Sequence, residues 1–259
     1  MLSKKKISFI VSLQKKKARE EHRLFIIEGD KLVREFLSAG QNVKTLVAKP
    51  GFVNSLPPAQ KQEIDEIIPC SYEELKRISS MKTPHNALAV VEMPEMKTDP
   101  EAPGQKLSVA LDFIQDPGNL GTIVRAAAWF GIRNIYCSEN CVDIFNPKAI
   151  QASMGAILHV RVAYTDLHSL FRNALRDGIK IYGATLDGNS IYSVKLENRG
   201  IIFFGNESRG ISDELSSYIT DKIMIPSTGR PAPGIDSLNV GMAASVIFSE
   251  FTRNISNRE

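Results

Sequence analysis

Short apolar runs alternate along the chain with longer segments of helical periodicity. In the second half, runs of strand length lie near residues 107, 134, 158, 180, 201 and 222. Helical stretches separate them, which predicts an α/β fold in which a parallel sheet is covered by helices on both faces. A final helix is predicted from about Ser237 to Asn254, and its broad apolar face indicates that it packs on the core.

The first part of the chain predicts a smaller α/β unit. A basic helix, the strand-like run LFIIEG, a helix starting near Asp30 and the run VKTLVA come first. A helix capped by Ser71, with Glu74 at the capping-box position, and the run ALAVVEM complete the unit. Residues 93–105 contain three prolines between two apolar runs. We therefore predict an N-terminal α/β domain over 1–95, a linker over 96–106 and a larger domain over 107–259.

Three glycine-punctuated polar segments follow or interrupt apolar runs of the second half. In the first, DPGNLGTIVRAA, the strand-like run VALDF is followed by a helix that Asn119 is predicted to open. Arg125 lies within that apolar helix, and its side chain should tilt back towards the positive N-terminal end. The alternative is an arginine that reaches solvent or pairs with a carboxylate.

The second segment, GNESRGIS, follows the run GIIFF and has the glycine spacing of a phosphate-binding loop. Such a loop needs a lysine after its second glycine, but Ile211 follows Gly210 here. Gly205 and Gly210 therefore predict a tight turn at a strand end, which presents Asn206 and Glu207. A simple turn would account for the glycines but not for a carboxylate beside a buried strand.

In the third segment, the run KIMIP leads into a proline-rich loop, and the residues SLN then begin the final helix. Seven residues separate Gly229 from Ser237. Asp236 or Ser237 could serve as an ordinary N-cap, which would leave Asn239 without a structural reason.

These three ordered segments resemble the successive motifs of the SpoU (TrmH) RNA methyltransferases of the SPOUT class. The resemblance covers about residues 107 to 254, and LFIIEGDKLVREFL resembles the small RNA-binding domain that many such enzymes carry. It implies methyl transfer from S-adenosylmethionine to a ribose 2′-hydroxyl in structured RNA, ribosomal RNA before transfer RNA. It also implies a C-terminal trefoil knot and a homodimer that uses the final helix or the helix opened by Asn119.

The resemblance also assigns the site residues. Asn119 and Arg125 would approach the target nucleotide, and Glu207, Ser237 and Asn239 match further positions of the catalytic set. The residues implied to bind S-adenosylmethionine, largely through backbone groups, are Thr185, Gly205, Asn206, Glu207, Ile225 and Leu238.

The sulfonium methyl is already a good electrophile. The enzyme therefore mainly has to align the ribose hydroxyl with the methyl group and to stabilise the negative charge that develops on the oxygen. A guanidinium is almost never deprotonated in proteins, so we expect Arg125 to stabilise the developing oxyanion while water or a phosphate accepts the proton. No metal is needed. Cys137 and Cys141 form one CxxxC pair without a second pair, which argues against a zinc site.

Composition narrows the class of protein further. The 259 residues are 43% hydrophobic, no apolar run reaches the length of a membrane span, and three cysteines give no disulfide framework. We expect a cytoplasmic protein. The net charge of +3 conceals a basic N-terminal end, where residues 1–35 hold ten Lys or Arg and five Asp or Glu. That end would suit an RNA backbone, although a solvated helix face gives the same pattern.

Other readings remain open. A tRNA 2′-O-methyltransferase, a methyltransferase acting on a base nitrogen, and a non-catalytic RNA-binding module of the same fold would all share most of these features. The absence of GxSxG, HExxH and GxGxxG removes the simplest hydrolase, metalloprotease and dinucleotide interpretations.

Overall fold

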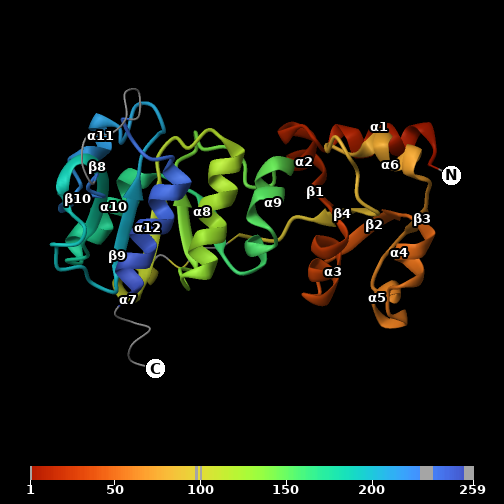
Figure 1. The fold of residues 1–259 in the computed structure, drawn as a ribbon, viewed down its shortest axis with the longest axis horizontal. Helices are drawn as coiled ribbons and strands as arrows, with labels where there is room; N and C mark the ends of the chain where they lie inside the picture. Colours follow the sequence, from red (N-terminus) through yellow and green to blue (C-terminus); the bar gives the residue numbers. More distant parts are fainter. Residues whose placement is uncertain (1, 97–98, 100, 228–235, 254–259) are drawn as a thin grey trace. The chain divides into compact units, whose positions relative to one another are not determined.

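The computed structural model describes residues 2–96, 99, 101–227 and 236–253. The chain forms two compact units (Figure 1). Unit 1 contains Met1–Glu95 together with Asp143–Leu158, and unit 2 contains Met96–Val142 and His159–Glu259. The segment Asp143–Leu158 therefore folds with the N-terminal unit, although its place in the sequence put it in the predicted domain 107–259. No described helix is long and apolar enough to cross a membrane.

Unit 1 is built on a mixed four-stranded sheet in the order β1-β4-β2-β3. Strands β1 and β2 run antiparallel to β4, and β3 runs parallel to β2. The strands are β1 (Leu24–Glu28), β2 (Val43–Ala48), β3 (Ile67–Pro69) and β4 (Ala87–Glu92). The helices are α1 (Lys4–Ser12), α2 (Lys16–His22), α3 (Asp30–Ser38), α4 (Pro50–Asn54), α5 (Pro58–Gln62), α6 (Tyr72–Ile78), α9 (Pro147–Ser153) and the 3₁₀ turn η1 (Ala156–Leu158).

The side chains of successive residues of β1 pack on opposite faces of this sheet. Ile26 joins a buried cluster with residues of α1 and α6. Its neighbour Phe25 packs on the other face against Phe36 of α3 and Phe145, which precedes α9. This alternation is the period-2 pattern of a strand covered on both sides. The capping box predicted at the start of α6 is confirmed, since Ser71 and Glu74 exchange both hydrogen bonds.

Unit 2 contains a six-stranded sheet in the order β10-β8-β9-β5-β6-β7, and every pair in it is parallel. The strands are β5 (Leu107–Leu111), β6 (Asn134–Cys137), β7 (Arg161–Tyr164), β8 (Ile181–Ser190), β9 (Gly200–Phe204) and β10 (Asp221–Met224). The helices are α7 (Ala102–Gln105), α8 (Pro117–Trp129), α10 (Leu167–Arg176), α11 (Asp213–Ser216) and α12 (Val240–Thr252).

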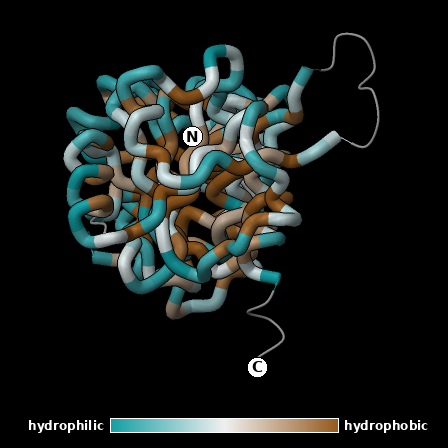
Figure 2. Tube along the Cα trace, turned by 90° about the vertical axis from the view of Figure 1, so that its left-hand side faces the viewer, coloured by the Kyte–Doolittle hydropathy of each residue, from teal (hydrophilic) through white to brown (hydrophobic). Residues whose placement is uncertain are grey.

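Helices cover both faces of this sheet, as predicted. On one face Phe203 packs against Phe171 of α10, and on the other face Phe204 packs against Phe248 of α12. Helix α8 lies beside α12 (Figure 1). Figure 2 looks onto unit 2 and shows hydrophobic segments in its interior with hydrophilic segments around them. Burial of both faces explains why β5 and β9 are apolar without alternation.

The starts of β7 and α8 differ from the prediction. The strand expected near residue 158 begins at Arg161, because Ala156–Leu158 forms a 3₁₀ turn. Helix α8 begins at Pro117 rather than Asn119, because Asp116 caps it and accepts a hydrogen bond from the Asn119 amide at 2.8 Å. The predicted linker contains a short helix, α7, that buries Ala102 and Pro103. The proline-rich loop before Ser237 lies mostly outside the described residues, and the trefoil knot stays a prediction.

Candidate active site

The site residues predicted from the first two polar segments follow β5 and β9, which are neighbouring parallel strands. Leu111 pairs with Phe204, so the chain leaves both strands at the same edge of the sheet. This carboxyl edge is where ligands bind in open α/β sheets. Thr185 and Gly205 each lie two residues beyond the paired residues Gly183 and Phe203, which places them at the same level on adjacent strands.

Three predicted side chains from three separate segments form a directional hydrogen-bond chain. Asn239 donates from Nδ2 to Oδ1 of Asn119 at 2.8 Å. Asn119 in turn donates from Nδ2 to Oε1 of Glu207, also at 2.8 Å. The structure thus brings together Asn119, Glu207 and Asn239, which are up to 120 positions apart in sequence.

The cap of α12 sets the direction of this chain. Oδ1 of Asn239 accepts the backbone N–H groups of Gly241 at 2.9 Å and Met242 at 3.4 Å. The amide nitrogen of Asn239 must therefore face Asn119, which orients the next amide in the same sense. Asn239, not Asp236 or Ser237, is the N-cap of α12, which begins at Val240 rather than near Ser237.

Asn206 ties the second segment to the end of β5. Its Nδ2 donates to the carbonyl oxygen of Phe113 at 2.9 Å, and its Oδ1 accepts the backbone N–H groups of Ser208 and Arg209. Phe113 has a left-handed backbone, with φ of 58°. Such a conformation is costly for a bulky residue and marks functional sites more often than other places. Its N–H donates to the Ser138 hydroxyl at 2.9 Å, so hydrogen bonds hold the strained residue on both sides.

The tight turn predicted between Gly205 and Gly210 is present. Asn206 and Gly210 exchange two backbone hydrogen bonds of 2.9 Å, and Gly210 has φ of +72°. A Cβ atom on Gly205 would overlap the backbone of Gly210 and Ile211, closer than the 3.0 Å that real Cβ atoms keep. Only glycine fits at this position, because backbone atoms cannot rotate away.

The remaining predicted residues have fewer protein contacts. Arg125 and Ser237 are exposed, and no side-chain hydrogen bond or ion pair joins either of them to another described residue. Leu238 is exposed and Ile225 is half-buried, directly after β10. The Thr185 hydroxyl is buried and makes no hydrogen bond of normal geometry with the described residues.

Two buried cysteines lie behind the loop that follows β5. Sγ of Cys141 accepts from the N–H of Ile114 and donates to the carbonyl of Leu111, both at 3.3 Å. A hydrogen bond from Cys137 lowers the pKa of the Cys141 thiol to about 7, against the effect of burial. The same interaction, together with burial, raises the pKa of Cys137. Within the described residues, no group of three or more His, Cys, Asp or Glu could hold a metal ion.

Sequence reasoning missed Asp116, Ser138 and Cys141 as supports of this site. The Asp-Pro pair was a usable signal for Asp116, because proline at the first helical position commonly follows a capping aspartate. Ser138 and Cys141 had no comparable signal, since their partners at Phe113 and Ile114 are 25 and 27 positions away.

The residues of the carboxyl edge also fit S-adenosylmethionine. Gly205 presents backbone groups without a side chain at the end of β9, and the Thr185 hydroxyl is a buried polar group on the neighbouring strand β8. An all-parallel sheet with its polar residues at this edge is an open α/β fold of the kind that binds ligands there.

Comparison with known proteins places this fold in the SPOUT class. A TrmH-family protein from Porphyromonas gingivalis is 37% identical, with a TM-score of 0.84 over 98% of this chain and 99% of that one. An rRNA methyltransferase from Sinorhizobium meliloti, solved with bound AdoMet, is 25% identical, with a TM-score of 0.83 over 98% and 97%. The predicted α/β fold, a parallel sheet covered by helices, is thereby confirmed.

The SpoU rRNA Methylase family model matches residues 106–249, and the chain belongs to this family, as its motifs predicted. The model of the MRM3-like substrate binding domain matches residues 4–89. The chain is 30% identical to the Bacillus subtilis 23S rRNA (guanosine(2553)-2′-O)-methyltransferase RlmP over 67% of each protein. It is also 30% identical to the mitochondrial rRNA methyltransferase 3 of Xenopus laevis over 69% of this chain, but the match spans only 44% of that relative's length.

Proposed function

We propose that this protein transfers a methyl group from S-adenosylmethionine to a ribose 2′-hydroxyl of ribosomal RNA. The observation that carries the proposal is the hydrogen-bond chain from Asn239 through Asn119 to Glu207, which unites the three polar segments at one edge of the sheet. The family and the relatives named for 2′-O-methylation of rRNA support the same reaction.

Each site residue has a proposed role. S-adenosylmethionine supplies the electrophilic methyl group, and Thr185, Gly205, Asn206, Glu207, Ile225 and Leu238 would hold it. Arg125 would stabilise negative charge on the ribose oxygen, since a positioned cation lowers the barrier as that charge develops. Asn119, Glu207 and Asn239 hold one another in place. Ser237 lies two residues before the cap of α12 and would contact the nucleotide or the cofactor.

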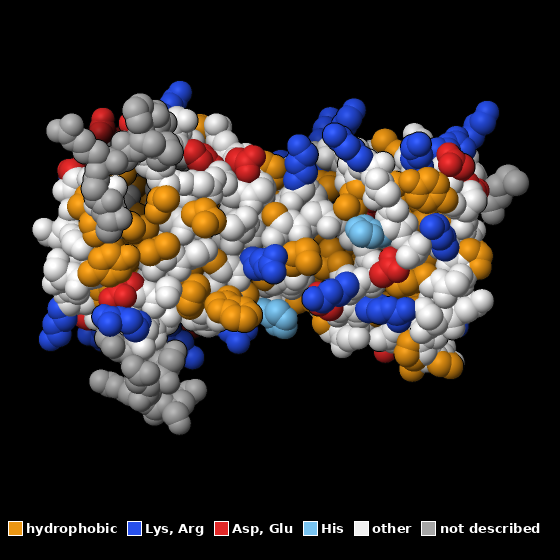
Figure 3. Space-filling model, viewed as in Figure 1, with side chains coloured by type: hydrophobic (Ala, Val, Ile, Leu, Met, Phe, Trp, Pro, Cys, Tyr) orange, Lys and Arg blue, Asp and Glu red, His pale blue; other side chains and the backbone are white. Residues whose placement is uncertain are grey.

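Unit 1 is proposed to bind the RNA. On the face in Figure 3, Lys and Arg side chains gather over α1 and α2. Phosphate contacts by such residues supply much of the affinity for RNA and weaken as salt is raised. The match of residues 4–89 to a substrate-binding domain supports this assignment.

We further propose a homodimer that uses α8 and α12. Figure 3 shows hydrophobic side chains exposed over these helices, and Trp129 and Met242 are 84% and 60% exposed. Residues of this size are usually covered when they gather on a surface. A monomer by light scattering at micromolar concentration would contradict the proposal. The three free, buried cysteines suit a reducing compartment, for which we propose the cytoplasm.

The test is transfer of labelled methyl from S-adenosylmethionine to unmodified ribosomal and transfer RNA, followed by digestion to nucleosides. We expect a 2′-O-methylated nucleoside from rRNA, lost with Arg125→Ala and kept with Arg172→Ala, an exposed arginine of α10 outside the site. Label in tRNA alone would favour the tRNA alternative, and label on a base would exclude ribose methylation. No cofactor binding by calorimetry would favour a non-catalytic RNA-binding module.

A further inference from the structure

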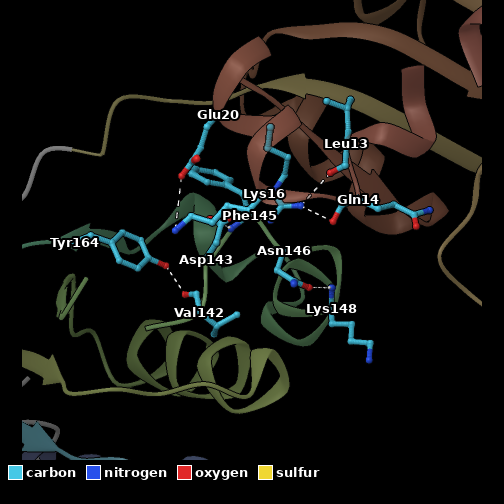
Figure 4. A network of polar contacts seen from close by, with 11 residues as sticks. Leu13, Gln14, Lys16, Glu20, Val142, Asp143, Phe145, Asn146, Lys148 and Tyr164 are labelled. Carbon is cyan, nitrogen blue, oxygen red and sulfur yellow. Dashed lines mark hydrogen bonds and ion pairs between the residues drawn. The ribbon is translucent and has the colours of Figure 1, made fainter. Parts of the chain in front are cut away.

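A buried ion pair anchors the segment Asp143–Leu158 in unit 1 (Figure 4). Nε and Nη2 of Arg19 donate to Oδ2 of Asp143 at 2.9 and 2.5 Å, and the Arg19 side chain is only 2% exposed. Nη1 of Arg19 also donates to the carbonyls of Leu13 and Gln14 at 3.0 and 2.8 Å. Oδ1 of Asp143 accepts the N–H of Phe145 at 2.9 Å. Two donors of Arg19 therefore fix Asp143 to the α1–α2 region, and the third nitrogen of that guanidinium holds Arg19 itself to the end of α1.

The same segment has a second anchor on β1 and α3. Phe145 packs on Phe25 with ring centroids 4.8 Å apart, and Nε2 of Gln151 donates to the carbonyl of Glu28 at 2.7 Å. Gly155 has φ of +83° and lies against Glu35. These contacts make the segment an integral part of unit 1.

The residue immediately before Asp143 is anchored in unit 2 instead. Val142 donates its N–H to the carbonyl of Ile114 at 2.8 Å, and its own carbonyl accepts from the Tyr164 hydroxyl at 2.6 Å. Ser138 and Cys141, a few residues earlier, hold the N–H groups of Phe113 and Ile114. The chain therefore passes from the loop that supports the site to the ion pair of unit 1 with no residue between the two anchors.

The other two passages between the units differ from this one. The passage after Glu95 enters the predicted linker 96–106 before it reaches β5. The passage at Leu158 and His159 leads into β7, away from the site loop. Among the described residues, the Val142–Asp143 peptide alone joins the site loop directly to a residue held by the N-terminal helices.

We propose that Asp143, held by Arg19, is a positioning residue that couples RNA bound on unit 1 to the cofactor site of unit 2. The proposal rests on the proposed function, because it takes unit 1 as the RNA-binding part. A displacement of the α1–α2 region is passed through Asp143 and Val142 to Ile114 and Phe113, and from Phe113 to Asn206. Both ligands then act on one continuous segment, and the proposal requires that this segment have two arrangements between which RNA and cofactor select.

Coupling of this kind is reciprocal and can be measured as a ratio of affinities. A cofactor that tightens RNA binding must itself bind more tightly, by the same factor, when RNA is present. We expect a factor of at least about 5, the lower end of typical couplings. The probes are S-adenosylhomocysteine, which cannot react, and an in vitro transcript of large-subunit ribosomal RNA.

Two perturbations test the connection. The first inserts two glycines after Val142, which keeps both anchors and removes the direct link, and its control is the same insertion after Met96 in the linker. The second is Arg19→Met with Asp143→Asn, which removes both buried charges while the asparagine can still accept from Phe145. Its control is Lys16→Ala, which breaks the exposed Lys16–Glu20 pair of the same helix.

We expect the coupling factor to fall below about 2 in the two test variants and to stay at the wild-type value in both controls, while each ligand alone binds within threefold of wild type. A purely structural role for the pair would leave the glycine insertion after Val142 with wild-type coupling, and that result overturns the proposal. A wild-type factor near 1 also overturns it. Failure of the proposed function is distinguishable, because the wild-type protein would then transfer no methyl group to RNA.

Discussion

The turn between Gly205 and Gly210 offers a sharp test of how the proposed cofactor site is built. A Cβ atom on Gly205 would overlap three backbone atoms, the carbonyl carbon and oxygen of Gly210 and the nitrogen of Ile211. These atoms belong to the turn that Asn206 and Gly210 close with two hydrogen bonds. Gly205→Ala must therefore either open the turn or push β9 away from it.

The expected cost follows from these contacts. Overpacking by a methyl group costs roughly 1–3 kcal/mol when neighbours can adjust, and backbone neighbours place this substitution at about 3 kcal/mol. Opening the turn would also move Asn206 and Glu207. We expect this displacement to weaken binding of S-adenosylmethionine by about 1.4 kcal/mol or more, which is a loss of about tenfold or more in affinity.

Gly40→Ala is the control for a glycine without close neighbours. Gly40 has a left-handed backbone, with φ of +65°, which Gly205 does not have, and a Cβ on Gly40 would meet nothing within 4 Å. Its cost is the conformational strain alone, about 1–2 kcal/mol. Urea unfolding followed by circular dichroism gives both stabilities, and calorimetry gives cofactor affinity. If Gly205→Ala is no less stable than Gly40→Ala and binds the cofactor normally, the backbone approach at Gly205 is not the constraint that we describe.

Three further results are expected. Asn239→Asp should keep the N-cap of α12, and hence the stability, but should lower kcat because the donor to Asn119 is lost. Asn239→Ala should lower kcat and also cost about 1 kcal/mol of stability in urea unfolding, because the cap is lost too. Equal kcat in wild type and Asn239→Asp would contradict the hydrogen-bond chain. Arg19→Met should destabilise the protein by about 3–5 kcal/mol because it leaves the Asp143 carboxylate buried and unpaired, and adding Asp143→Asn should recover part of that loss in the same urea assay. The pKa of the Cys141 thiol predicts that thiolate absorbance at 240 nm rises in one step near pH 7, and that this step is missing in Cys141→Ser. The folded pKa of about 7 lies below the ordinary value of 9.0. The thiolate's contribution to stability is therefore present above about pH 9 and is lost as the pH falls through 7.

Much of the sheet could be predicted because its strands are apolar on both faces. Runs such as those of β5 and β9 are too short for helices and lie between helical segments, so periodicity alone indicated a parallel sheet. The carboxyl-edge position of Gly205 and Glu207 then followed from their place after a strand.

Long-range packing could not be predicted in the same way. Nothing local to Asp143 shows that its partner is Arg19, 124 positions away, because an isolated acid after a loop reads as a solvated residue. The assignment of Asp143–Leu158 to unit 1 depends on that pair and on the packing of Phe145, both of which exist only in the folded chain. The end of β6 and the start of β7 gave no hint that the intervening residues leave unit 2.

The uneven distribution of contacts within the site favours a division of roles among its residues. Hydrogen bonds join the side chains of Asn119, Glu207 and Asn239 to one another, so their main effect is to hold the three segments together. The side-chain amide of Asn119 has a second N–H, which it does not donate to a described residue. Arg125 lies on the helix that carries Asn119, but its guanidinium has no ion pair or hydrogen bond to a described residue. A cation without a protein partner stays available for a phosphate or for a developing oxyanion, whereas a paired one would have to break its bond first. We therefore infer that Asn119→Ala, Glu207→Ala and Asn239→Ala each lower stability and activity together, while Arg125→Ala lowers kcat and leaves the urea midpoint unchanged. A shift of that midpoint with Arg125→Ala would show that the guanidinium supports the fold instead.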